Sequence, residues 1–534
     1  MNRRIALILL SLTASYFYSS AQVRVNQPVV LTGESLQGIT GFPADAIAGF
    51  RYTGDHWEQV PVQIDQRDYR SAFDLYNAKN NNLQTHDYLV YCDPKTYSGE
   101  DSDPLIDEND ELVFMSQDLG LLYEGDDYPE YTLYDPVMFE VYDPTTEEAG
   151  YLYLFLQTGA LPLDAGRPYV TYEYQLLTNG PFKNAYDITG PNPEDSYITT
   201  SYYEQHFSDD WIRDQIVITT DNAPGVDILD YDKLQLAPGL CYRHIGTFSE
   251  GSGTHIASTS GGVRAIRSIM GANSGALIQR TQLFYAHKDE TETIWRVHPV
   301  RGITEYYDYT EDALGMVYYN EHNLQGVIID GQEDELDTRF AKWSLLSGTP
   351  GSILTFTDLE ADFPLTGLHN YYHDQRNSNT DQCIGDQHAM GANGFFLQQQ
   401  IPNTDPRDGA YNSLTIRAES YYLPPDQSLA VIFEHYLEED EPMITETEGT
   451  FLVEKETAEL LVFPNPTTDY LNIQIFPTGH TPIALYDLQG NLILERTIFF
   501  AHYLTIPEQV PSGLYVLRAI SGDEVLSQKI YIRR

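Results

Sequence analysis

Short runs in which apolar and polar residues alternate recur along the chain, and they predict β-strands. The run from Val60 to Asp65 places Val60, Val62 and Ile64 on one face, and Pro61 indicates a strand at a sheet edge. Further strands are predicted within residues 111–115, 151–156, 215–219, 277–285, 293–300, 326–329, 352–356 and 429–433. The best candidate helix covers residues 334–346. Turn residues separate the runs at spacings typical of β-sandwiches and barrels.

The pattern therefore predicts an all-β fold with several domains. Two regions with sandwich-type patterning cover residues 22–160 and 165–437, and a compact unit covers residues 460–534. Between them, residues 438–459 hold nine acids and one lysine, a composition typical of an extended, solvated linker.

The N-terminus has the pattern of a secretory signal peptide over residues 1–21. Arg3 and Arg4 precede an apolar region of eight residues, Ile5 to Leu12, and Ser19-Ser20-Ala21 offers small residues for cleavage before Gln22. Eight residues are too few to cross about 30 Å of hydrocarbon. No later run approaches the length of a membrane span, so we expect a mature chain without a transmembrane segment.

The C-terminal unit carries four motifs in a fixed order. They are Phe-Pro-Asn-Pro at 463–466, Leu-Tyr-Asp-Leu-Gln-Gly at 485–490, Ser-Gly-Leu-Tyr-Val-Leu at 512–517 and Lys-Ile-Tyr-Ile at 529–532. Alternation around the motifs predicts a β-sandwich of immunoglobulin-like size. Together the motifs resemble the type A C-terminal sorting domain of the type IX (Por) secretion system of Bacteroidetes. The alternative is an appended immunoglobulin-like module without a sorting role.

The resemblance implies a route but no activity for the rest of the chain. It implies Sec export, passage across the outer membrane and contact of residues 460–534 with the type IX machinery and a sortase. The destination would be the outer cell surface or the extracellular space, with the C-terminal domain removed.

Composition excludes some partners. The chain has 79 acidic and 30 basic residues and a formal net charge of −49, so nucleic acid and anionic lipid surfaces are not expected partners. Its 41 tyrosines favour β structure and suit stacking on sugars. Three distant cysteines, Cys92, Cys241 and Cys383, exclude a disulfide framework. We expect buried thiols, with one bridge and a leftover thiol as the alternative.

One basic segment, residues 264–301, interrupts the acidic chain. An Arg beside a His on a sheet face could neutralise a uronate or sulfate group and remove a proton, which is lyase chemistry. We therefore predict Arg296 and His298 as catalytic residues, with Tyr306 or Tyr307 as an alternative base. The predicted substrate-binding residues are Arg264, Arg267, Arg280 and Arg301. The alternative is that these arginines form structural salt bridges with surrounding acids.

An acidic loop from Gly99 to Glu111 spaces oxygen ligands as calcium loops do, although it fails the EF-hand template. The predicted calcium ligands are Asp101, Asp103, Asp107 and Asn109, with a solvated turn as the alternative. His369 and His373 would share a helix face, but neighbouring residues favour loop histidines without a metal.

The leading hypothesis is a secreted or surface-displayed β protein whose body binds or cleaves an extracellular polysaccharide, with lyase-like chemistry on an anionic chain. The alternative is a non-enzymatic, calcium-binding surface or adhesion protein. A metal-dependent hydrolase using His369 and His373 is a third hypothesis. Nucleophile-elbow, phosphate-loop, His-Glu-x-x-His and dinucleotide-binding motifs are absent from the sequence.

Overall fold

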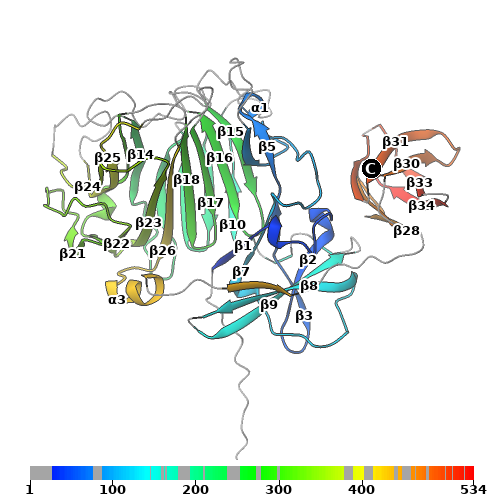
Figure 1. Ribbon diagram of the computed structural model, residues 1–534, viewed down its shortest axis with the longest axis horizontal. Coiled ribbons are helices and arrows are strands. Elements are labelled where there is room, and N and C mark those ends of the chain that lie inside the picture. Colours follow the sequence, from blue (N-terminus) through cyan, green and yellow to red (C-terminus); the bar gives the residue numbers. More distant parts are fainter. Residues whose placement is uncertain are drawn as a thin grey trace, which may run out of the picture.

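The computed structural model is built almost entirely of antiparallel β-sheets, which confirms the all-β prediction (Figure 1). The structure describes residues 27–75, 87–144, 146–157, 161–162, 165–166, 168–177, 193–208, 211–236, 253–271, 278–296, 301–377, 389–401, 413–437, 443–447 and 459–534, apart from 464, 469, 477–479, 500, 508 and 522–523. The predicted signal peptide lies outside the described residues.

The N-terminal region contains three sheets, of which the first two share one apolar core. The first is β1 (Pro28–Thr32), β7 (Glu111–Met115) and β4 (Gln63–Asp65). The second is β27 (Met443–Thr447), β8 (Thr132–Asp143), β9 (Glu148–Gln157), β2 (Ile47–Tyr52) and β3 (Trp57–Val60). The third is the pair β5 (Arg67–Ser71) and β6 (Asp87–Tyr91).

The predicted strand at 60–65 is divided at Pro61. β3 ends at Val60 and β4 begins at Gln63, because proline cannot donate a ladder hydrogen bond. Both strands lie at sheet edges, as the proline indicates, and Val60, Val62 and Ile64 pack into the same core.

The central region is a large sandwich. One layer is a nine-stranded sheet in the order β15 (Gly253–Ser260), β16 (Ala265–Gly271), β17 (Ile278–Phe284), β18 (Lys288–Arg296), β26 (Ser413–Leu423), β23 (Gly351–Ala361), β22 (Trp343–Gly348), β20 (Val317–Asn320) and β21 (Asn323–Ile328). Two four-stranded sheets face it. They are β10 (Val170–Glu173), β11 (Ser196–Thr200), β12 (Tyr203–Phe207) and β13 (Arg213–Ile218), and β14 (Leu229–Leu236), β19 (Ile303–Tyr309), β25 (Ala392–Leu397) and β24 (Leu368–His373).

The inner face of the nine-stranded sheet forms the core of this sandwich. Along β18, Asp289, Thr293 and Trp295 are buried, and Trp295 packs with residues of β14, β19 and β25. The interior also holds polar side chains, among them Arg213, whose guanidinium contacts Asp289 at 2.8 Å. Since successive residues of a strand point to opposite faces, Glu290, Glu292 and Ile294 point to the outer face.

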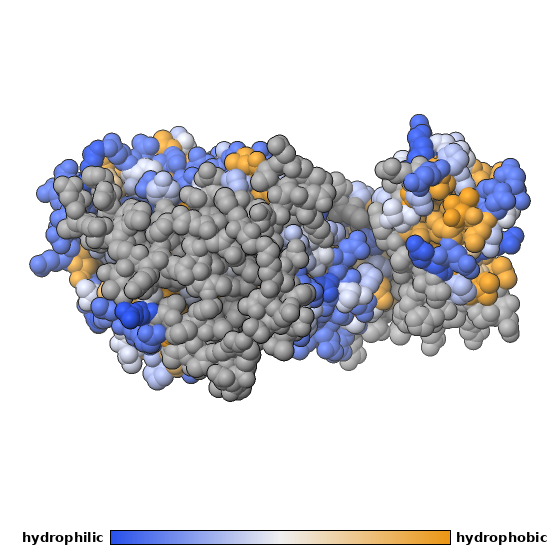
Figure 2. All heavy atoms as spheres, turned by 90° about the horizontal axis from the view of Figure 1, so that it is seen from above, coloured by the Kyte–Doolittle hydropathy of each residue, from blue (hydrophilic) through white to orange (hydrophobic). Residues whose placement is uncertain are grey.

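The C-terminal domain is a two-sheet sandwich with its own apolar core. Its sheets are β28 (Glu459–Phe463), β29 (Tyr470–Phe476) and β32 (Ala501–Thr505), and β31 (Leu492–Phe499), β30 (His480–Asp487), β33 (Gly513–Ser521) and β34 (Glu524–Ile532). Apolar side chains gather on part of its surface in Figure 2. The exposed ones include Leu488, Leu492, Ile520 and Val525.

Three segments differ from the sequence-based expectation. Residues 429–433, predicted as a strand, are helical, because the Ser428 side chain caps the helix by accepting a hydrogen bond from the Val431 N–H. The predicted helix at 334–346 is absent, and its end contributes to β22. Within the acidic segment 438–459, residues 443–447 pair with β8 as β27.

Helices in the described residues are short. They are η1 (Gly33–Ser35), η2 (Ala44–Ala46), α1 (Ala72–Leu75), η4 (Ser116–Asp118), η6 (Glu311–Ala313), α3 (Leu429–Ile432) and the π-helical η8 (Phe433–Leu437). In that part of the chain, none combines the length and apolar character that crossing a membrane would require.

Candidate functional site

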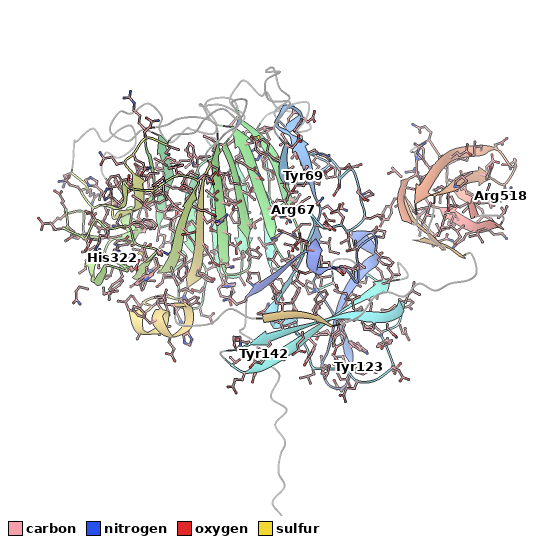
Figure 3. The ribbon with its side chains drawn as sticks, viewed as in Figure 1. Arg67, Tyr69, Tyr123, Tyr142, His322 and Arg518 are labelled. Atoms are coloured by element: carbon pink, nitrogen blue, oxygen red, sulfur yellow. The ribbon has the colours of Figure 1, made fainter. Side chains whose placement is uncertain are left out.

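A pocket of about 820 Å³ lies on the outer face of the nine-stranded sheet. Its floor comes from β17, β18, β26 and β23, and its wall comes from β5, β6 and β7 of the N-terminal region. Strand β5 lies beside the sheet in Figure 1, and Figure 3 labels its residues Arg67 and Tyr69. An antiparallel sheet buried on one face can present the other to solvent, and here that face carries the pocket.

The strand register arranges the floor in rows. Glu290 on β18 lies opposite Glu419 on β26, and Phe356 on β23 continues that row. In the next row Glu292 lies opposite Arg417. Directly opposed residues on one sheet face lie close enough for their side chains to interact. The floor is therefore a set of charged pairs beside apolar side chains.

Lys288 holds the two opposed glutamates together. Its ammonium lies 2.7 Å from a Glu290 oxygen and also contacts Glu419, which accepts a hydrogen bond from the Tyr421 hydroxyl. Burial alone would disfavour the charged lysine, but Glu290, Tyr421 and Glu419 raise its pKa. Lys288 therefore stays protonated and compensates the carboxylates.

The wall of the pocket ends in an ion-pair network. Arg67 contacts Glu111 at 2.7 Å, and Arg264 pairs with Glu111 and, at 2.8 Å, with Asp65. Burial favours the neutral form of Glu111, but the charges of Arg264 and Arg67 lower its pKa. For Asp65 burial prevails and raises the pKa in spite of Arg264. These groups fix the N-terminal region against β16.

The arginines predicted to bind substrate are divided between the interior and the surface. Arg264 and Arg267 are each 1% exposed, and Arg280 is also buried. Arg267 pairs with Glu194 and Arg280 with Glu305, so these three occupy the structural ion pairs considered as the alternative. Arg301 is exposed. Arg267 and Arg280 therefore lie in ion pairs inside the sandwich, and Arg264 lies in the ion pairs between the N-terminal region and β16.

The predicted catalytic pair is only partly within the described structure. Arg296 is the last residue of β18, two positions after Ile294, which lines the pocket. His298 lies outside the described residues. Of the proposed alternative bases, Tyr307 packs against the core of the sandwich and accepts a hydrogen bond from Arg213 at 2.9 Å. Tyr306 is buried on the opposite face of β19, in a cluster with Ala389 and Ala392.

The acidic loop forms a series of turns stabilised by its own carboxylates. Asp101 accepts a hydrogen bond from the Asp103 N–H at 3.0 Å, and Asp107 accepts one from the Asn109 N–H at 2.9 Å. Burial, with Asp68 and Asp107 nearby, raises the pKa of Asp101 to about 6. Within the residues that the structure describes, no group of three or more His, Cys, Asp or Glu side chains is arranged to hold a metal ion.

The two histidines considered for a metal site lie on a strand rather than in the expected loop. His369 and His373 belong to β24, and the His369 ring stacks on Phe396 with centroids 5.0 Å apart. Cys92 is a free, half-buried thiol, while Cys241 and Cys383 lie outside the described residues.

The pocket carboxylates were not singled out from the sequence. Their signal is present in Lys288-Asp289-Glu290-Thr291-Glu292, where charges at alternate positions mark a polar strand face. That signal does not identify β26 as the neighbouring strand, because the pairing joins residues more than a hundred positions apart.

In the C-terminal domain, the Phe-Pro-Asn-Pro motif is anchored to the last strand. The Asn465 side chain donates to the Lys529 carbonyl at 2.7 Å and accepts from the Tyr531 N–H at 2.9 Å. In the second motif, Asp487 accepts hydrogen bonds from the N–H groups of Gln489 and Asn491, and Gly490 adopts a φ of +86°. The motif residues thus close the turn and join the two ends of the domain.

Comparison with protein families identifies the C-terminal part of the chain. Residues 461–533 match the family model described as the secretion system C-terminal sorting domain. None of the curated proteins compared with the chain matches it significantly.

Two solved structures are distantly similar. A candidate aldose 1-epimerase from Escherichia coli is 11% identical with a TM-score of 0.22, covering 42% of this chain and 97% of its own. An alpha-mannosidase from Enterococcus faecalis is 9% identical with a TM-score of 0.29, covering 93% of this chain, which spans 57% of the mannosidase. TM-scores this low do not establish a shared fold or a shared function.

The family match agrees with the four sequence motifs and with the two-sheet sandwich that they build. The C-terminal domain is therefore a secretion system C-terminal sorting domain, and the chain is a type IX secretion cargo destined for the cell surface or the extracellular space.

Proposed function

We propose that the body of this exported chain binds an extracellular polysaccharide in the pocket of the nine-stranded sheet. The observation that carries the proposal is a pocket of about 820 Å³ lined by carboxylates, Arg417 and Thr281 beside the apolar Leu283, Ile294 and Phe356. A sugar ring offers hydroxyl groups to the polar side chains and a C–H face to the apolar ones.

A blocking substitution tests this proposal. Thr281→Trp places a large side chain on the pocket floor, whereas Thr199→Trp makes the same change on the exposed side of β11. With the purified chain on a glycan array, we expect Thr281→Trp to weaken binding at least about tenfold and Thr199→Trp to leave it unchanged. Equal binding by both variants would refute the pocket as the site.

Cleavage by elimination stays a prediction that rests on Arg296 and His298. It is supported by the position of Arg296 on the strand that supplies Ile294 to the pocket. The appearance of ultraviolet-absorbing unsaturated uronates would report lyase action. We expect Arg296→Ala and His298→Ala to abolish it with the fold intact. Full activity in both variants would refute their roles.

Calcium binding is the second candidate function. Two acceptor atoms of the acidic loop, Asp101 Oδ2 and Asn109 Oδ1, are buried without a hydrogen-bond partner. An oxygen-binding cation would satisfy them. Calorimetric titration with calcium should detect binding that Asp101→Ala and Asp107→Ala remove and that Asp221→Ala, on the exposed surface, retains. Undiminished binding in the loop variants would eliminate this site.

We also propose that a sortase removes the sorting domain after export. Mass spectrometry of the exported chain tests this step, because removal predicts a product that ends before Glu459. An exported chain that retains residues 461–533 would contradict it.

A further inference from the structure

The charge of the pocket restricts the kind of polysaccharide that fits it. Three basic residues line it, namely Arg67, Lys342 and Arg417, against five acidic residues, namely Glu111, Glu290, Glu292, Asp358 and Glu419. The excess is therefore acidic, in a chain whose formal net charge is −49.

The basic groups at the pocket are already compensated. Arg417 pairs with Glu292 at 2.9 Å and with Glu360 at 3.1 Å. Arg67 pairs with Glu111 at 2.7 Å. Lys288, on the same face of β18 as Glu290, is held between two glutamates.

One basic side chain of the pocket lining is not compensated by a carboxylate. Among the described lining residues, Lys342 is the cation with no carboxylate at ion-pair distance, and it shares the exposed rim with Asp358. The rim therefore contributes one positive and one negative charge.

A uronate or sulfate group needs a different environment. Binding such a group strongly requires an uncompensated Arg or Lys, since the charge-assisted pair supplies most of the affinity. In this pocket Arg67 and Arg417 would have to give up a carboxylate partner, so Lys342 at the exposed rim offers a polyanion a single positive charge on an otherwise acidic surface. Hydroxyl groups meet no such penalty, because they donate to carboxylates and accept from Arg417 or Lys342.

We infer that the ligand of the pocket is an uncharged glycan and not a polyanion. The inference rests on the proposed function and narrows it, since it names the substrate class of the same site. It places the pocket at odds with the lyase-like chemistry on an anionic chain expected from the basic segment, because the pocket disfavours a charged uronate.

A matched pair of polymers separates the two classes. Fully methyl-esterified and de-esterified polygalacturonate share a backbone and differ in charge, and an array of uncharged, uronate-containing and sulfated glycans extends the comparison. We expect the chain to bind uncharged members at least about tenfold more tightly than anionic ones, with little dependence of that binding on salt. Tighter binding of anionic members would overturn the inference while leaving glycan binding in place.

Charge reversal at the rim provides a second test. Asp358→Lys creates an uncompensated positive charge at the pocket, and Asp221→Lys makes the same change on the exposed surface elsewhere. We expect only Asp358→Lys to raise the affinity for de-esterified polygalacturonate, by about tenfold. An equal increase in both variants would show an effect of net charge alone and would contradict the inference. If no glycan of either class binds, the proposed function fails together with the inference.

Discussion

Replacing Arg267 by methionine distinguishes a structural arginine from a substrate-binding one. Arg267 lies inside the central sandwich, where it pairs with the fully buried Glu194, donates to Gln282 at 2.9 Å and stacks over Phe207 at 4.2 Å. Methionine keeps much of the apolar stem and removes the charge. The buried carboxylate then retains the Ser196 hydroxyl at 3.0 Å as a hydrogen-bond donor.

The expected cost is large because the ion pair has no access to water. Removing one partner of a buried pair costs about 3–5 kcal/mol, since the other charge is left uncompensated. For a domain of this size, 1 kcal/mol corresponds to about 2–4 °C, so we expect Tm to fall by about 6–20 °C. Burial raises the pKa of Glu194 even with Arg267 beside it. The variant should therefore be less destabilised near pH 5 than near pH 8, because protonation of a carboxyl with a raised folded-state pKa favours the fold.

The assay is thermal unfolding followed by intrinsic fluorescence, with Trp211 beside the site as a reporter. Arg267→Met/Glu194→Gln removes both charges and should recover most of the stability. Arg339→Met is the matched control, since Arg339 is paired at the surface and should change Tm little. An unchanged Tm in Arg267→Met would refute the reasoning, and so would a double variant no more stable than the single one.

Further predictions concern other parts of the chain. Burial disfavours the charged His206, but hydrogen bonds to Asp195 at 2.7 Å and Asp214 at 2.6 Å raise its pKa; the stability it contributes should be full below about pH 6.5 and lost as pH rises through the raised value. His206→Gln should remove this pH dependence of Tm, and identical profiles would contradict it. Burial and nearby acids raise the pKa of Cys92 to about 12, so alkylation at about pH 8, mapped by peptide mass spectrometry, should be far slower in the folded chain than in the unfolded chain. Comparable rates would argue against this environment. Truncation after residue 447 keeps β27 and should leave the chain in the periplasm, whereas unimpaired export would contradict the role of the sorting domain. Truncation after residue 440 also removes β27 and should lower Tm further; equal Tm values would show that β27 does not stabilise the body.

Local patterns predicted many of the strands. Residues 111–115 are β7 as expected, and the alternation at Val60, Val62 and Ile64 identifies the buried face correctly. The motifs at 463–466 and 485–490 also identify the sorting domain, because turn and anchoring residues act within a short stretch of chain.

Short apolar runs and polar segments were harder to assign. The five apolar residues at 429–433 fit a strand or a helix equally well, and the cap at Ser428 selects the helix. Residues 443–447 look like linker on composition. They form β27 because they pair with the edge of β8, about 300 residues earlier in the chain, and the local sequence gives no sign of that pairing.

The sequence by itself determined the β architecture, the sorting domain and the presence of a basic segment at 264–301. The tertiary structure decided which way that segment faces. Arg264 meets Glu111 across 153 positions and Arg267 meets Glu194 across 73, so their partners depend on how the sheets stack. Packing one face of the nine-stranded sheet against two others buries Arg267 with Glu194. The N-terminal region lies against the opposite face, where it buries Arg264 with Glu111, and the paired carboxylates of that face form the pocket.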